Sequence, residues 1–150
     1  DPTRILQTGS QRTDGFEFAL NGNLTRSWRV AGGYAYQDAF ITSSTTNAVA
    51  GKKVALVPRH TFSLWNNYQI IPKLAVGLGV IHHTESFAAV VLPGYTRADV
   101  GLFYSITERW RLQGNLENLF DTKYYINADG NNNISPGRPR SVRFGLIARF

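Results

Sequence analysis

The chain has 150 residues, of which 43% are hydrophobic and 13% aromatic, and its 14 glycines favour strands and turns over helices. It contains no cysteine, which excludes disulfide frameworks, thiolate metal sites and cysteine nucleophiles. The formal net charge of +6 does not predict nucleic-acid binding, because the 16 Lys and Arg residues are scattered and their longest run is Lys52-Lys53.

The sequence is expected to continue a longer polypeptide, because it contains no methionine and therefore no initiator residue. Its first ten residues, DPTRILQTGS, have no apolar core, so any secretory signal is expected upstream. No stretch reaches the roughly 18 apolar residues of a membrane-spanning helix, and no segment holds a 3.6-residue period.

Apolar residues recur instead at every second position, which predicts strands with one polar and one apolar face. Near 15–25, Phe16 and Phe18 alternate with Glu17 and Ala19. The same alternation predicts six further strands, near 28–42, 60–70, 74–87, 95–106, 110–126 and 140–150. Trp65 departs from the pattern, because it falls in phase with polar residues and should lie on the polar face unless a bulge shifts the register.

The lengths of the strands and connections indicate a membrane barrel. Strands of soluble proteins average about five or six residues, whereas these reach the length that a tilted strand needs to cross a bilayer. Short connections at 25–27, 71–73 and 107–109 alternate with long ones near 43–59, 88–94 and 127–139. Transmembrane barrels alternate short periplasmic turns with long extracellular loops in the same way. The sequence therefore predicts an all-β fold, an antiparallel transmembrane β-barrel fragment of about seven long strands.

Residues 115–125, NLENLFDTKYY, resemble the N-x-x-N-L-F-D-x-x-Y signature near the end of TonB-dependent outer-membrane receptors. Three further stretches resemble the same family in the same order: Gln7-Thr8-Gly9 followed by Arg12 and by GFE at 15–17, then VPRH at 57–60, then GRPR at 137–140. The terminal Phe150 resembles the aromatic end by which outer-membrane proteins are recognised for assembly.

The resemblance implies that these are the last strands of a 22-stranded, plugged barrel in the outer membrane of a Gram-negative bacterium. It implies import of a ferric siderophore or a similar nutrient with TonB-transduced energy, and the ligand stays open between ferric siderophore, vitamin B12, haem and sugar. Nothing in the 150 residues resembles the plug domain or the segment that contacts TonB. The expected partners are therefore outer-membrane lipid, the missing strands and plug, the iron-siderophore ligand of the parent, and TonB only through the missing N-terminal part; no cofactor is expected.

Charged residues on the polar phase are interpreted as a salt-bridged lumen wall that packs against a plug or lines water. They are Glu17, Arg29, Arg97, Asp99, Arg111, Glu117, Arg143 and Arg149. A catalytic site would need paired carboxylates or a nucleophile beside a base, and no motif supports either, so the chain is not predicted to be an enzyme.

Four residues are candidates for ligand contact: Tyr124, Tyr125, His82 and His83. The tyrosines would stack on a siderophore or form an upper aromatic girdle. His82 and His83 lie near Glu85, but adjacent residues on a strand face opposite ways, so no metal site is predicted there. Residues 127–135, NADGNNNIS, are oxygen-rich but lack the spacing of a calcium loop, and an extracellular loop is the preferred interpretation.

Two other interpretations stay open. One is a self-contained outer-membrane barrel of about eight strands with a structural or adhesive role, which would need residues 1–14 to supply a separate strand. The other is a soluble lipid-binding β-barrel, whose polar face would be richer in Lys and Glu.

Overall fold

The computed structural model describes residues 9–46, 48–131 and 133–150, and strands are the only regular elements in these ranges. Within them, no helix has the length and apolar character to cross a membrane. Seven of the described strands form one sheet in which every strand is antiparallel to its neighbours. In sheet order they are β1 (Ser10–Asn23), β2 (Trp28–Ser43), β3 (His60–Ile71), β4 (Leu74–His83), β7 (Tyr95–Ser105), β8 (Trp110–Glu117) and β11 (Ser141–Ala148).

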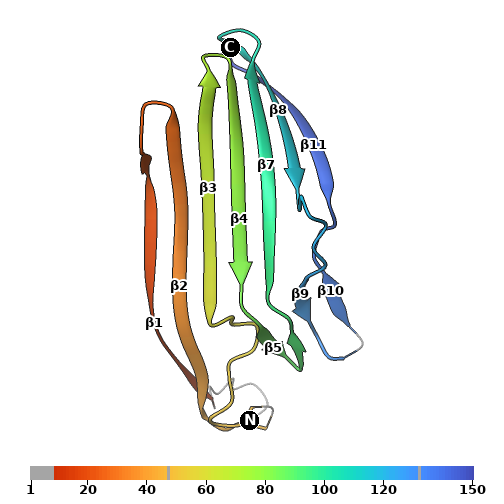
Figure 1. Cartoon of the computed structure of the whole chain (residues 1–150). Coiled ribbons are helices and arrows are strands. Elements are labelled where there is room, and N and C mark those ends of the chain that lie inside the picture. Colours follow the sequence, from red (N-terminus) through yellow and green to blue (C-terminus); the bar gives the residue numbers. More distant parts are fainter. Residues whose placement is uncertain (1–8, 47, 132) are drawn as a thin grey trace.

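Two small hairpins continue beyond one end of the sheet. One joins β5 (Ser86–Ala88) to β6 (Val90–Leu92), and the other joins β9 (Tyr125–Ala128) to β10 (Ile134–Pro136). Figure 1 shows both at the end opposite the C-terminus, where the long connections lie. The short turns at 24–27, 72–73 and 106–109 lie at the other end, so the predicted alternation of short and long connections is confirmed.

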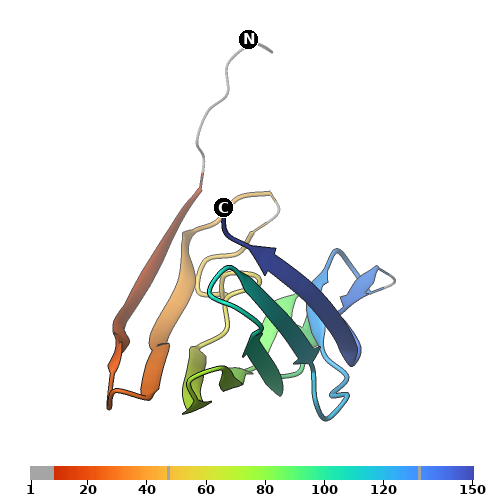
Figure 2. The same ribbon diagram turned by 90° about the horizontal axis from the view of Figure 1, so that it is seen from above.

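The sheet is curved and open (Figure 2). In the described residues β1 pairs only with β2, and β11 only with β8. The alternative interpretation, a self-contained barrel of about eight strands, requires residues 1–14 to form a separate strand. Residues 1–8 of this segment lie outside the described residues. Ser10–Asn23 instead form one strand paired with β2 along its length, so the described sheet does not close on itself.

Cross-strand register separates an apolar from a polar face. On the apolar face, the paired positions Leu78, Val100, Leu116 and Val142 form a row across β4, β7, β8 and β11. These side chains have no protein layer over them: Phe144, on the same face, is 84% exposed. Soluble monomers rarely expose a continuous apolar surface of this kind, whereas a lipid-facing sheet must do so.

The polar face is more crowded, as expected for the inside of a curved sheet. Trp65 lies there against Gly77 and Gly79, at positions where a Cβ atom would collide with the indole ring. The pairing of β3 with β2 and β4 is regular at Trp65, and the register shift of the β3–β4 pair falls between Gln69 and Ile71. No bulge is therefore needed at Trp65, because glycines on β4 make room for its ring.

Several predicted strand ends were wrong. The strand predicted at 15–25 begins at Ser10, because Gln11 to Asp14 continue the ladder with β2. The strand predicted at 74–87 ends at His83, because the His60 amide donates to the side-chain Oγ1 of Thr84, at 3.0 Å, in place of its carbonyl. The strand predicted at 110–126 ends at Glu117, and 140–150 is shortened to Ser141–Ala148.

The long connections also contain more structure than predicted. The segments expected as loops at 88–94 and 127–139 include β6 and β10, respectively. A small apolar core of Ala88, Leu92 and Ala128, with Val90 packed against it, joins the two hairpins. The 44–59 connection is bonded to the first hairpin, since the Leu56 amide donates to the Phe87 carbonyl at 2.7 Å.

Candidate functional site

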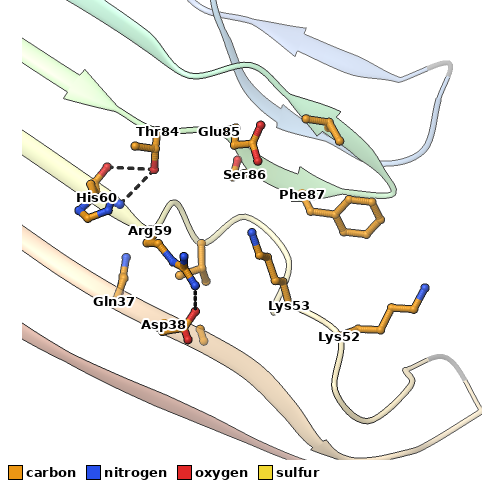
Figure 3. Close-up of a pocket in the computed structure, with 13 residues that line it drawn as sticks. Gln37, Asp38, Lys52, Lys53, Arg59, His60, Thr84, Glu85, Ser86 and Phe87 are labelled. Atoms are coloured by element: carbon orange, nitrogen blue, oxygen red, sulfur yellow. Dashed lines mark hydrogen bonds and ion pairs between the residues drawn. The ribbon is translucent and has the colours of Figure 1, made fainter.

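A cavity of about 430 Å³ lies at the long-loop end, where the 44–59 connection returns along β2. The Val54 amide donates to the Ala39 carbonyl at 3.0 Å, and the Gln37 amide donates to the Arg59 carbonyl at 2.9 Å. On β2 these two hydrogen bonds lie two residues apart, at Ala39 and Gln37, whereas on the returning chain they lie five residues apart, at Val54 and Arg59. Residues 55–58 therefore loop out of the pairing with β2. The cavity forms where they leave it, between β2, the connection and β5 (Figure 3).

Two further contacts stabilise this detour. Leu56 has a φ of 61°, the left-handed region, which turns its amide toward the Phe87 carbonyl. The Gln37 side chain donates from Nε2 to the Pro58 carbonyl at 3.2 Å. The VPRH stretch is therefore the point at which the chain re-enters the sheet as β3.

The cavity is lined by three cations and two carboxylates. Arg59 Nη2 lies 2.8 Å from Asp38 Oδ1, and this hydrogen-bonded ion pair raises the pKa of the Arg59 guanidinium. Lys52 and Lys53 have no ion pair or side-chain hydrogen bond with any described residue, and neither has Glu85.

Apolar side chains complete the lining. Phe87 is 42% and Val91 62% exposed, and Figure 3 shows Phe87 on the side of the cavity opposite the β2 residues. The cations of the lining outnumber its carboxylates by three to two, and two of them are ammonium groups without an ion pair in the described part of the chain. Beside an exposed aromatic ring, they suit a ligand that carries anionic oxygens next to an aromatic or apolar part.

The N-L-F-D signature forms a turn built around Asn118, whose side chain is buried, with 1% of the residue exposed. Asn118 Nδ2 donates to the carbonyls of Thr122 at 2.9 Å and Arg138 at 3.1 Å, and its Oδ1 accepts from the Thr122 amide at 2.9 Å. Asn118 and Asp121 both have positive φ, 55° and 53°, which asparagine and aspartate tolerate better than most residues. The signature thus ends β8 and fastens the GRPR stretch to it.

A charged pair on β7 holds this turn. Asp99 accepts from the Asn118 amide through Oδ1 at 2.8 Å and from Arg97 Nη2 through Oδ2 at 2.8 Å. Arg97 Nη1 donates to the Tyr124 hydroxyl at 2.9 Å. Gly137 lies against the Tyr124 ring at a distance that leaves no room for a Cβ atom. The polar face of β7 and the β9–β10 hairpin are therefore joined through one hydrogen-bonded network.

The four candidate ligand residues do not form one site, and only His83 and Tyr124 are brought together, on the ring of Tyr95. His82 and His83 lie on opposite faces of β4, as alternation requires: His82 Nδ1 and Thr96 Oγ1 are hydrogen-bonded at 2.9 Å, whereas His83 stacks on Tyr95 at 5.1 Å. Tyr124 stacks on Tyr95 at 4.3 Å and is only 5% exposed, whereas Tyr125 is 41% exposed. Of these residues, Tyr125 presents the largest free surface.

Seven of the eight charged residues predicted on the polar face share one face in the observed register, and Arg149 lies beyond the end of β11. Only four of the eight are paired within the described residues. Arg97 pairs with Asp99, and Glu117 accepts from Arg143 at 2.7 Å and from Arg138 at 3.3 Å. The others, Glu17, Arg29, Arg111 and Arg149, have no ion pair in this part of the chain.

The described residues contain no group of three or more His, Asp or Glu side chains that could hold a metal ion. The oxygen-rich stretch 127–135 forms the β9–β10 hairpin, closed by a 2.9 Å bond from the Asp129 amide to the Asn133 carbonyl; residue 132 lies outside the described residues.

Sequence reasoning missed the residues that line the cavity, above all Lys52, Lys53 and Phe87. The one local signal for this cavity is the adjacent lysine pair upstream of VPRH, which by itself indicates only a short basic run. It also missed that Asn118 is buried, although the signature itself contains that residue.

Comparison with known proteins assigns the chain to a family. A family model described as TonB dependent receptor-like, beta-barrel, matches residues 1–119. The chain is 36% identical to the catecholate siderophore receptor Fiu of Escherichia coli, over 94% of this chain and 20% of that protein. It is 30% identical to the probable TonB-dependent siderophore receptor PiuA of Acinetobacter baumannii, over 100% of this chain and 22% of that protein.

Solved structures lead to the same family assignment. The crystal structure of PiuA superposes with a TM-score of 0.85 at 27% identity, covering 93% of this chain and 22% of that one. The closed form of Fiu superposes with a TM-score of 0.84 at 30% identity, covering 95% and 21%. The chain spans about a fifth of the length of the curated relatives it matches, so its sheet corresponds to one part of their barrels. The open antiparallel sheet, its exposed apolar face and these matches together show that the chain belongs to the TonB-dependent receptor-like β-barrel family.

Proposed function

We propose that the 150 residues form the last strands of an outer-membrane receptor barrel that imports a ferric siderophore or a similar scarce nutrient with energy transduced by TonB. The names of the relatives support this: they include a catecholate siderophore receptor and a metal-pseudopaline receptor. The remaining strands, a plug domain and the contact with TonB belong, in this proposal, to the rest of a longer polypeptide.

The apolar face supports placement in a bilayer. On β2 it runs from Trp28, beside a short turn, to Tyr36, which packs on His60 at 5.2 Å. Eight residue steps cover about 26 Å along the strand, or about 20 Å of height at a tilt of about 40°, which is most of the roughly 25 Å apolar band of outer-membrane barrels. Trp28 and its cross-strand partner Tyr68, with Trp110, then supply the aromatic girdle at the short-turn end.

The observation that carries the proposal of ligand binding is the cationic cavity at the long-loop end. In the proposed orientation this end is extracellular, so Lys52 and Lys53 would meet the ligand before it enters the barrel. Two ammonium groups without an ion-pair partner among the described residues favour an anionic metal chelate through long-range attraction and direct contact. Tyr125 and His83 remain candidates for further contacts.

Uptake measurements test this proposal. The full-length receptor is expressed in a bacterial strain without other siderophore receptors, and uptake of radioactive iron is measured with a ferric catecholate and, separately, a ferric hydroxamate. We expect uptake of at least one chelate, which should disappear in a host that lacks TonB.

A paired substitution tests the role of the cavity. Replacing Lys52 and Lys53 together with Glu should raise the apparent KM for the transported chelate about tenfold or more. Lys123→Glu, an exposed lysine at the same end that does not line the cavity, is the matched control and should leave uptake unchanged. Failure to transport either chelate, or transport that is independent of TonB, would refute the proposed function.

A further inference from the structure

Two of the short turns repeat one five-residue pattern. Residues 24–28 read LTRSW and residues 106–110 read ITERW, so an apolar residue and a threonine are followed, after two positions, by a tryptophan. In the first turn the amides of Leu24 and Thr25 donate to the Trp28 carbonyl at 2.8 Å and 3.3 Å, and the same two bonds in the second turn measure 2.9 Å and 3.3 Å. In both turns the threonine Oγ1 accepts from the amide two residues further on, at 3.2 Å. The chain therefore builds the same turn twice.

Each of these turns combines an exposed cation with an exposed tryptophan. The cation is Arg26 in the first turn and Arg109 in the second, and neither side chain forms an ion pair with a described residue. Trp28 and Trp110 are exposed, and so is the apolar residue that opens each turn. A guanidinium and an indole ring are thus held within two residues of each other at the short-turn end of the sheet (Figure 1).

Positive charge predominates along this whole edge of the described sheet. The third short turn carries Lys73, and the Arg149 amide donates to the Arg109 carbonyl at 2.9 Å, which brings a further cation to the second turn. Against these cations, the three turns include one carboxylate side chain, that of Glu108. Successive short turns are two strands apart, or about 10 Å. The positive charge is therefore spread along the edge of the sheet and is not gathered at one point.

The place of the cations indicates what they meet. In the bilayer placement proposed above, the apolar face lies in hydrocarbon, so the edge formed by the short turns lies at the depth of the phospholipid headgroups. Tryptophan is favoured at this depth because its ring is largely apolar and its indole N–H is polar. A guanidinium can donate to two oxygens of one phosphate at once. A soluble anion, in contrast, would gain nothing from the exposed indole beside each arginine.

The sign of the charge indicates which headgroup is preferred. A zwitterionic headgroup carries an amine that cancels the charge of its phosphate, whereas an anionic headgroup keeps a negative charge that attracts each unpaired cation. We propose that the two turns are binding sites for anionic phospholipids, with Arg26 and Arg109 on the phosphate and Trp28 and Trp110 against the glycerol and the first carbons of the chains. The inference rests on the bilayer placement of the proposed function and adds a lipid preference that is independent of the transported ligand.

Photochemical capture of lipid by the full-length receptor tests this. The photoreactive amino acid p-benzoylphenylalanine is placed at position 24 and, in a second variant, at position 106, where it replaces the exposed apolar residue that opens each turn. Each receptor is illuminated in bilayers of equal parts phosphatidylglycerol and phosphatidylcholine with identical acyl chains, and mass spectrometry measures the ratio of the two lipid adducts. A basic residue near an anionic membrane surface contributes a factor of about five in binding, so we expect phosphatidylglycerol adducts to exceed phosphatidylcholine adducts about fivefold at both positions.

Substitutions in the turns provide reciprocal controls. Arg26→Gln should bring the adduct ratio at position 24 close to one and leave the ratio at position 106 unchanged. Arg109→Gln should lower the ratio at position 106 only. Glu108→Gln removes the carboxylate of the second turn and should raise the ratio there. Lys123→Gln, at an exposed lysine shortly before β9, should change neither ratio.

The outcomes separate the lipid preference from the membrane placement. Equal capture of the two lipids at both positions, or an unequal ratio at position 24 that survives Arg26→Gln, would overturn the inference and leave the placement intact, since lipid is still captured. Capture of no lipid at either position would overturn both. Neither readout requires transport or TonB, so a receptor that fails to import a chelate would still be expected to show the lipid preference.

Discussion

Replacement of Gly79 by Ala tests the contact between Trp65 and the glycines of β4. A Cβ atom at position 79 would lie 2.5 Å from Cε3 and 2.7 Å from Cζ3 of the indole. Non-bonded carbon atoms prefer about 3.5–4.0 Å, so the ring would have to move by about 1 Å. Overpacking of this kind costs about 1–3 kcal/mol, against roughly 0.5–1 kcal/mol gained when a glycine leaves a strand. We expect Gly79→Ala to lower the free energy of unfolding by about 1–2 kcal/mol.

The cost should vanish when the ring is absent. In a Trp65→Ala background, Gly79→Ala should be neutral or slightly stabilising, giving a coupling energy of about 1–3 kcal/mol in a double-mutant cycle. The assay is guanidinium unfolding of the full-length receptor in lipid vesicles, followed by tryptophan fluorescence and, for variants without Trp65, by circular dichroism. Gly145→Ala is the control on the same face, because its added Cβ meets nothing within 4 Å. An equal effect of Gly79→Ala in both backgrounds would refute the reasoning.

Three further predictions concern the membrane, the topology and the signature turn. Spin labels at Leu102 and Phe144, in bilayers of the full-length receptor, should collide with oxygen dissolved in lipid, because both side chains are exposed on the apolar face; collision with an aqueous nickel chelate at both sites would contradict the membrane assignment. A cysteine at Asp129 should react with an impermeant maleimide on intact cells and one at Thr107 should not, since the two positions lie at opposite ends of the sheet; the reverse pattern would invert the orientation. Asn118→Asp removes the amide donor to two carbonyls, at about 1–3 kcal/mol for each buried group left unsatisfied, so amide exchange in residues 121–140 should accelerate; unchanged protection would show that the turn does not depend on Asn118.

The seven long strands could be predicted because each face of a strand has a uniform chemical character along its length. In β7, for example, Val100 and Leu102 alternate with Asp99 and Gly101. This alternation predicts both that the segment is a strand and which of its two faces is apolar. The ends could not be predicted in the same way. Asn118 and Leu119 interrupt the alternation, but such an interruption does not by itself mark a strand end, since Trp65 interrupts β3 without ending it. What stops β8 is a left-handed backbone at Asn118, whose side chain donates to a carbonyl 20 residues away.

The cavity was unpredictable for a related reason. Its walls come from segments that are distant in sequence, such as Asp38 and Arg59, or Leu56 and Phe87. No local pattern records that residues 55–58 leave the ladder, since this depends on where the returning chain meets β2. The lysine pair is visible in the sequence, but only the folded chain shows that neither lysine has a carboxylate partner among the described residues.

Under the proposed function, the packing between the long connections limits how the ligand preference of the receptor can be altered. The 44–59 connection is bonded to Phe87 in the first hairpin, and Ala88 and Leu92 of that segment pack on Ala128 of the second. Transplanting one connection from a receptor of different specificity would leave its neighbours without their contacts, and the recipient cavity would lose its shape along with its old preference. Redirecting uptake would therefore require exchanging the 44–59 connection, the β5–β6 hairpin and the β9–β10 hairpin together.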